Sequence, residues 1–174
     1  MKKQLLPVII LTTFLSLIFC IGCISTPQCI SPPQRTSPPQ SQYDKNMETI
    51  KGIVEEYNKT HSYNVTGKFE CAQMSEDVWD MVETQGINAK IVLGDLQKNV
   101  STIEDINHAW VIAEVTPDRW VAMETTAGYL SCPDPNYCAV NNPRYFMGWD
   151  FASPKEMHDF LKTGKSPDYM QGKL

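Results

Sequence analysis

The first 24 residues place the strongest constraint on this chain. Lys2 and Lys3 precede a mostly apolar run, from residue 5 to residue 24, that contains no charged side chain. A short basic segment followed by a long apolar core is typical of an export signal. The run is also about long enough for a helix to cross a hydrocarbon core of roughly 30 Å. The sequence therefore predicts a signal peptide or an uncleaved signal anchor over residues 1–24, with the following domain outside the cell.

The end of this run contains a candidate lipidation site. Ile21, Gly22 and Cys23 resemble the lipobox of prokaryotic lipoproteins, in which a small residue precedes the cysteine that is lipidated and becomes the new N-terminus. Cys20 stands where that motif usually has Leu. A lipid on Cys23 and an uncleaved helix would both anchor the chain to the membrane at the cell surface. We favour the lipid because a tether-like segment follows Cys23 directly.

That segment separates the N-terminus from a single domain. Residues 25–44 are rich in Pro, Ser and Gln, a composition that favours an extended chain without an apolar face. We interpret these residues as a tether. Residues 45–174, about 130 in number, are enough for one domain with its own hydrophobic core.

The charge balance of the exported part argues against two classes of partner. Two of the 15 basic residues belong to the signal region, whereas all 20 acidic residues lie beyond it. The domain is therefore acidic overall. We expect it to bind neither nucleic acid nor an anionic membrane surface.

Three Asn-x-Ser/Thr sequences lie in the domain, beginning at Asn58, Asn64 and Asn99. In an exported chain each is a possible N-glycosylation site, and a glycan would mark its segment as exposed.

The cysteines suggest one local disulfide. Beyond the signal region there are four, at positions 29, 71, 132 and 138, which allow three pairings. Cys132 and Cys138 bracket a turn-rich loop with two prolines, so we predict that they pair with each other. No His lies close and the spacing is long for zinc, so we expect no metal and no cofactor. Cys71 is then left with Cys29 in the tether or with no partner.

Hydrophobic periodicity predicts an α+β domain in which N-terminal helices pack on a small antiparallel sheet. Gly86 is expected to end the second helix, and a turn through Pro117 to join the last two strands as a hairpin. The predicted helices span residues 47–58, 71–85 and 154–161, and the predicted strands span 87–96, 108–115 and 120–125.

On this outline, Cys71, His108 and Glu124 are candidate catalytic residues. Cys71 falls in the first turn of a helix, where backbone N–H groups and the helix dipole favour a thiolate. His108 begins one strand of the hairpin and Glu124 ends the other, so the two strand ends are neighbours. A nucleophile, a base and an acid that orients the base occur in that order. A two-residue hairpin loop would put His108 and Glu124 on opposite faces, whereas a longer loop or a bulge would put them together.

Each of the three residues also has an ordinary explanation when taken alone. Cys71 could be an inert core thiol, since cysteine is among the most often buried residues. His108 and Glu124 could be a satisfied histidine and a solvated carboxylate at strand ends.

Three blocks of sequence resemble the transglutaminase-like superfamily, whose members share a papain-related α+β core. The blocks are Phe-Glu-Cys-Ala at 69–72, His-Ala-Trp-Val at 108–111 and Arg-Trp-Val-Ala-Met-Glu-Thr-Thr at 119–126. The resemblance covers roughly residues 47–126. It implies that Cys71 is the nucleophile, His108 the general base and Glu124 the third member, at a position where the family usually has Asp. Trp110 and Trp120 become candidates for the substrate cleft.

The resemblance implies a cysteine-dependent hydrolase or acyltransferase that acts on amide bonds, with an envelope peptide or protein as its substrate. The alternative is a non-catalytic module on the same fold that binds an envelope peptide or glycan. A third possibility is a structural domain in which Cys71 forms a disulfide with Cys29.

Overall fold

The structure is a computed structural model that describes residues 40–64 and 70–165. The expected signal segment, Cys23, Cys29 and the tether up to residue 39 lie outside the described residues. Within the described ranges, no helix has the length and apolarity needed to cross a membrane.

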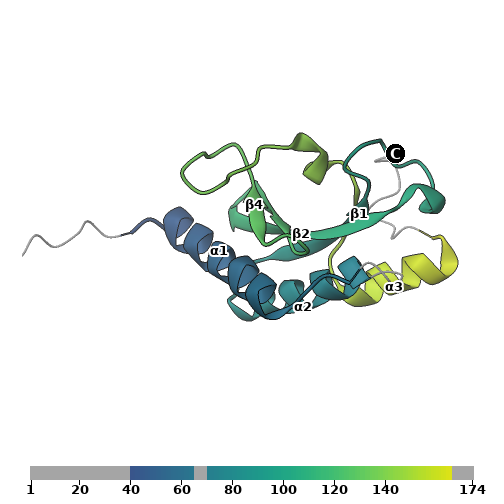
Figure 1. Ribbon diagram of the computed structural model, residues 1–174, viewed down its shortest axis with the longest axis horizontal. Helices are drawn as coiled ribbons and strands as arrows, with labels where there is room; N and C mark the ends of the chain where they lie inside the picture. Colours follow the sequence, from purple (N-terminus) through teal and green to yellow (C-terminus); the bar gives the residue numbers. More distant parts are fainter. Residues whose placement is uncertain (1–39, 65–69, 166–174) are drawn as a thin grey trace, which may run out of the picture. The chain divides into compact units, whose positions relative to one another are not determined.

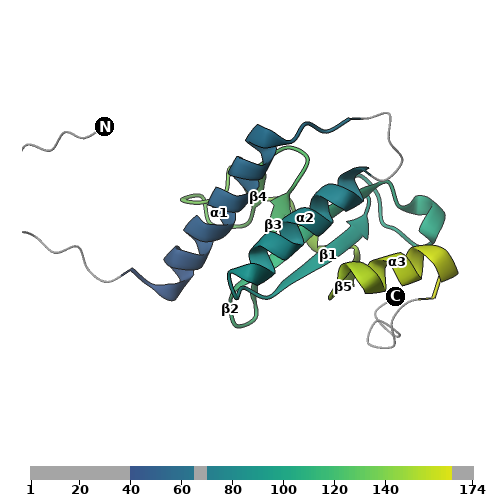
Figure 2. The same ribbon diagram turned by 90° about the horizontal axis from the view of Figure 1, so that it is seen from below.

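The described residues form an α+β domain, as the sequence predicts, with three α-helices and one five-stranded antiparallel sheet. The strand order is β4-β3-β2-β1-β5. The helices lie on one face of the sheet, and α2 runs along β1 and β2 (Figures 1 and 2). The helices are α1 (Gln42–Thr60), α2 (Glu70–Thr84) and α3 (Pro154–Thr163). The strands are β1 (Ala89–Gly94), β2 (His108–Thr116), β3 (Arg119–Glu124), β4 (Tyr129–Ser131) and β5 (Trp149–Phe151).

Helix α1 starts earlier than the periodicity predicts, inside the stretch interpreted as tether. The Ser41 side chain caps it by accepting a hydrogen bond from the Asp44 backbone N–H at 3.1 Å. Such a cap satisfies a backbone donor that the helix itself cannot. The apolar spacing begins only at Met47, so periodicity alone places the start several residues too late.

Helix α2 matches its prediction closely. Its residues Met74, Val78 and Val82 are buried against the sheet, while Met81, expected on the same stripe, is 37% exposed. The chain leaves the helix through Gly86, whose φ of +72° is a left-handed conformation that favours glycine. This helix carries Cys71 at its second residue.

The β2–β3 hairpin contains a bulge that sets which side chains share a face. Thr116 pairs with Arg119, so the loop holds two residues, but the register shifts between Glu114 and Thr116. Beyond the bulge, Val111 pairs with Met123. One further step in this register places Glu124 opposite Trp110. Glu124 therefore lies on the same face as His108, because residues two apart on a strand share a face.

Strands β4 and β5 were not predicted from the sequence, because three residues each give no readable alternation. Two short 3-10 helices, η1 (Ile103–Asp105) and η2 (Pro143–Phe146), were not predicted either. The segment that contains η2 lies over the sheet face opposite the helices (Figure 1). Its Tyr145 packs with Trp110 and Ile112. Both faces of the sheet are thus covered near the start of β2.

The predicted Cys132–Cys138 disulfide is present, with the two Cα atoms 5.6 Å apart. Its loop is tied to the first turn of α1 in two places. The Tyr137 hydroxyl donates to Asp44 at 2.7 Å, and the Tyr43 hydroxyl donates to Asp134 at 3.0 Å. The disulfide therefore also holds the start of the domain.

Removing this disulfide should lower the free energy of unfolding by about 2 kcal/mol, the loop-closure value for so short a loop. The measurement is urea denaturation of Cys132→Ala/Cys138→Ala beside the oxidised parent chain. In both proteins the other four cysteines, at positions 20, 23, 29 and 71, are replaced by Ala to prevent thiol exchange. An unchanged midpoint would contradict a stabilising role for the loop.

Candidate active site

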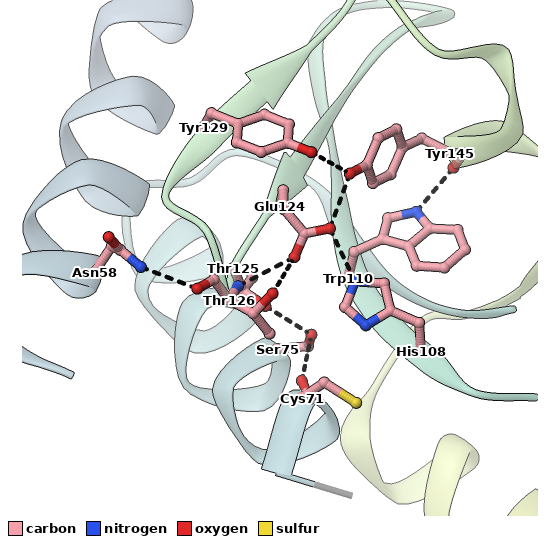
Figure 3. Close-up of polar contacts among 10 residues, drawn as sticks. All are labelled: Asn58, Cys71, Ser75, His108, Trp110, Glu124, Thr125, Thr126, Tyr129 and Tyr145. Carbon is pink, nitrogen blue, oxygen red and sulfur yellow. Dashed lines mark hydrogen bonds and ion pairs between the residues drawn. The ribbon is translucent and has the colours of Figure 1, made fainter. Parts of the chain in front are cut away.

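Cys71 lies where the start of α2 meets the ends of β2 and β3 (Figure 3). It is a free thiol and 7% exposed. The buried Ser75 hydroxyl, one turn later, donates to the Cys71 carbonyl at 2.8 Å and contacts the Thr125 hydroxyl at 3.2 Å. These bonds join the first turn of α2 to the segment that follows β3. They hold the thiol close to the ends of both strands.

His108 bridges Cys71 and Glu124. Its Nε2 lies 2.8 Å from Glu124 Oε2, and because an ionised carboxylate only accepts, Nε2 carries the proton. The second ring nitrogen faces the Cys71 side chain (Figure 3), and that side chain helps to raise the pKa of His108 through hydrogen bonding and charge. The bulge in β2 is what makes this bridge possible. The sequence-predicted trio is therefore together in space.

The Glu124 carboxylate is 4% exposed and receives four donors. Oε2 accepts from His108 Nε2 and from the Tyr145 hydroxyl, each at 2.8 Å. Oε1 accepts from the Thr126 backbone N–H at 3.1 Å and from its hydroxyl at 2.6 Å. A buried carboxylate is stable only with such partners. The longer side chain of Glu thus reaches the imidazole without losing its other contacts.

The pKa values reflect this arrangement. Burial alone would lower the pKa of His108, but its hydrogen bonds to Cys71 and Glu124 outweigh burial and raise that pKa from 6.5 to about 9. Burial opposes ionisation of Glu124, yet the His108 bond and charge, with the Thr126 and Tyr145 bonds, lower its pKa. At neutral pH the imidazolium and the carboxylate are both charged.

These shifts determine how the pair contributes to stability. The folded pKa of His108 is raised, so its contribution is complete below about pH 6.5 and is lost as the pH rises through about 9. The folded pKa of Glu124 is lowered, so its contribution is present at neutral pH and is lost in acid.

The two tryptophans proposed for the cleft lie in different places. Trp110 is fully buried, and its indole N–H donates to the Tyr145 carbonyl at 2.8 Å, so it supports the site from behind. Trp120 is at the opposite end of β3 from Glu124, where it lines a separate pocket.

The three possible glycosylation sites differ in their surroundings. Asn58 lies on α1, and its side-chain nitrogen, the atom to which a glycan attaches, donates to the Thr126 carbonyl at 3.1 Å. Asn64 and Asn99 are exposed. Among the described residues, no cluster of three or more His, Cys, Asp or Glu side chains is arranged to hold a metal ion.

Comparison with known proteins gave no match. No protein-family model, no curated protein and no solved structure is similar enough to this chain to be matched to it. The site is therefore interpreted from its geometry and from the sequence alone.

Sequence reasoning found the three central residues but missed those that hold them. Thr126 belongs to the third block of the resemblance, and its two-residue spacing from Glu124 suits a local side-chain contact. Ser75 lies one turn from Cys71, a spacing at which a hydroxyl can bond the earlier carbonyl. Tyr145 carries no local signal, because its contact with Glu124 depends on the chain returning over the sheet.

The raised pKa of His108 can be measured directly. In an imidazole NMR titration, wild-type His108 should titrate near pH 9. In Glu124→Gln it should titrate lower, because burial still disfavours the charge while one of the charged partners is gone. The chain has three histidines, so His108→Gln assigns the resonance. A wild-type value near 6.5 that does not respond to Glu124→Gln would rule out the coupled pair.

Proposed function

We propose that this chain is a cysteine-dependent acyl-transfer enzyme on a transglutaminase-like, papain-related core, and that it acts on amide or peptide bonds. The observation that carries the proposal is the His108 ring, which faces Cys71 with one nitrogen and bonds to Glu124 through the other (Figure 3). Residues with only structural roles would not be expected to form a thiol–imidazole–carboxylate arrangement in this order. The resemblance of the three sequence blocks supports the same assignment.

The thiol proton resides on His108 in the charged form that the raised pKa of this residue favours at neutral pH, so the reacting pair is a Cys71 thiolate and an imidazolium. In the first step the thiolate attacks the carbonyl carbon of the substrate. Glu124 stabilises the imidazolium and keeps the ring oriented. The first backbone N–H groups of an α-helix lack partners within the helix, so the N–H of Cys71 is a candidate donor to the developing oxyanion.

In the second step the imidazolium gives its proton to the leaving amine, and the C–N bond breaks. The acyl group stays on Cys71 as a thioester. His108 then activates a water for hydrolysis, or an amine for transfer, and the attack restores the thiol. Neither step requires a metal.

The proposal also includes the place where the protein acts, which is the outer face of the membrane. Residues 1–24 support export, and Gly22-Cys23 supports a lipid anchor on Cys23. The domain would then lie outside the cell at the membrane, with an envelope peptide or protein as its substrate. The Cys132–Cys138 disulfide agrees with an oxidising location.

The pocket beside Trp120, separate from Cys71, favours the alternative, a non-catalytic module that binds an envelope peptide or glycan. Trp120 and Phe146 line an open pocket of about 200 Å³ that also contains the Lys90–Asp150 ion pair. Aromatic walls with polar groups are a common way to hold a small ligand. This function would survive Cys71→Ala.

Acyl-enzyme formation tests the enzyme proposal without a known substrate. The full chain is incubated with p-nitrophenyl acetate, and peptide mass spectrometry locates the acetyl group. The tryptic peptide 69–90 contains Cys71 and no other cysteine. We expect release of nitrophenolate with acetylation of this peptide, and acetylation slower by roughly 100-fold or more in His108→Gln.

The matched control is Cys71→Ala, which should release nitrophenolate only at the background rate. Acetylation of wild-type Cys71 no faster than that of the urea-denatured chain would refute the enzyme proposal and leave the binding module.

A further inference from the structure

Two tyrosine hydroxyls form a line that ends on Glu124. Tyr145 of η2 is 1% exposed, and its hydroxyl lies 2.8 Å from Glu124 Oε2. The Tyr129 hydroxyl of β4 lies 2.8 Å from the Tyr145 hydroxyl (Figure 3). Both residues lie beyond residues 47–126, the part of the chain in which the three central residues occur.

The direction of these hydrogen bonds follows from the charge of Glu124. An ionised carboxylate only accepts, so Tyr145 donates its single proton to Glu124. Its oxygen is then an acceptor, and Tyr129 donates to it. Burial, the bond from Tyr129 and the charge of Glu124 raise the pKa of Tyr145 above its usual value, so the hydroxyl keeps its proton.

We propose that Tyr145 is a positioning residue for the Cys71–His108–Glu124 site, with Tyr129 as its support. This inference rests on the proposed function and deepens it. Tyr145 holds Glu124 Oε2 within hydrogen-bond distance of His108 Nε2 and shares the negative charge of that oxygen. Thr126 holds the other oxygen, so the carboxylate cannot turn away from the imidazole.

The surroundings of Tyr145 fit this role better than simple packing. A phenylalanine would fill the same core position without the cost of burying a hydroxyl. The Trp110 indole N–H donates to the Tyr145 carbonyl, and the two rings meet edge to face at 5.4 Å. Asn142 caps η2, with Pro143 at its start. The backbone of Tyr145 is thus fixed independently of its hydroxyl.

The groups that face Glu124 come from several elements. His108 reaches it from β2, Tyr145 from η2, and Thr126 from just after β3, while Cys71 acts through His108. His108 is the only one of these with a positive charge. Loss of the Tyr145 donor makes the carboxylate less stable relative to its protonated form. As the pH falls, Glu124 then takes up a proton at a higher pH than in the wild type, and its ion pair with His108 is lost there.

The test measures alkylation of Cys71 by iodoacetamide against pH, using the full chain and following peptide 69–90 by mass spectrometry. In Tyr145→Phe we expect the rate at neutral pH to fall about tenfold. The acid limb of the profile, the pH range over which the alkylation rate rises from its low value in acid, should move to higher pH by up to roughly one unit. Tyr129→Phe should shift the limb in the same direction by less, because it acts only through Tyr145.

Tyr57→Phe is the matched control. Tyr57 is a buried tyrosine whose hydroxyl donates at 2.7 Å to a carboxylate other than Glu124, that of Asp77. The Tyr57→Phe variant should be less stable than the wild type, but its rate of Cys71 alkylation should depend on pH as in the wild type. A purely structural role for Tyr145 would make the two variants behave alike.

The outcomes separate the two proposals. A reactive wild-type Cys71 whose profile is unchanged in Tyr145→Phe overturns the role of Tyr145 alone. A wild-type Cys71 that reacts no faster than in the denatured chain overturns the proposed function as well. If Tyr145→Phe does not fold, Tyr129→Phe decides: a shift of its acid limb supports the role, and an unmoved limb overturns it.

Discussion

The rest of the site depends on the hydrogen bonds to the Glu124 carboxylate, which is only 4% exposed. Burying an ionised carboxylate without partners would cost several kcal/mol. Glu124 avoids this cost because His108, Tyr145 and Thr126 supply four donors. His108 and Tyr145 come from parts of the chain distant from Glu124 in the sequence, so the site forms only when the domain has folded around it. The same interactions set the charge of His108.

The bulge in β2 is the backbone feature that makes this possible. Without it, the register of the hairpin would place Glu124 and His108 on opposite faces of the sheet. With it, both lie on the face covered by η2, and His108, as the first residue of its strand, also reaches the start of α2. One extra residue in the hairpin therefore brings the acid, the base and the thiol together.

The sequence predicted what depends on local pattern. The three helices, the hairpin, the Cys132–Cys138 pair and the α+β class all follow from periodicity, turn residues and short spacings. The trio of Cys71, His108 and Glu124 was also found, but its geometry was not, because a bulge leaves no clear mark on the alternation of a strand. Strands β4 and β5 are too short to be read. Tyr145 could not be predicted, since its contact with Glu124 forms only through tertiary packing.

The proposed reaction requires Cys71 and His108 to lie within bonding reach of one another in the native chain. The most direct measurement uses 1,3-dibromoacetone, a short reagent that alkylates a thiol and then any nucleophilic nitrogen that its three-carbon arm can reach. We predict a cross-link between peptides 69–90 and 99–119, which carry Cys71 and His108, and its loss in His108→Gln. Alkylation of Cys71 without a cross-link to His108 would contradict the account.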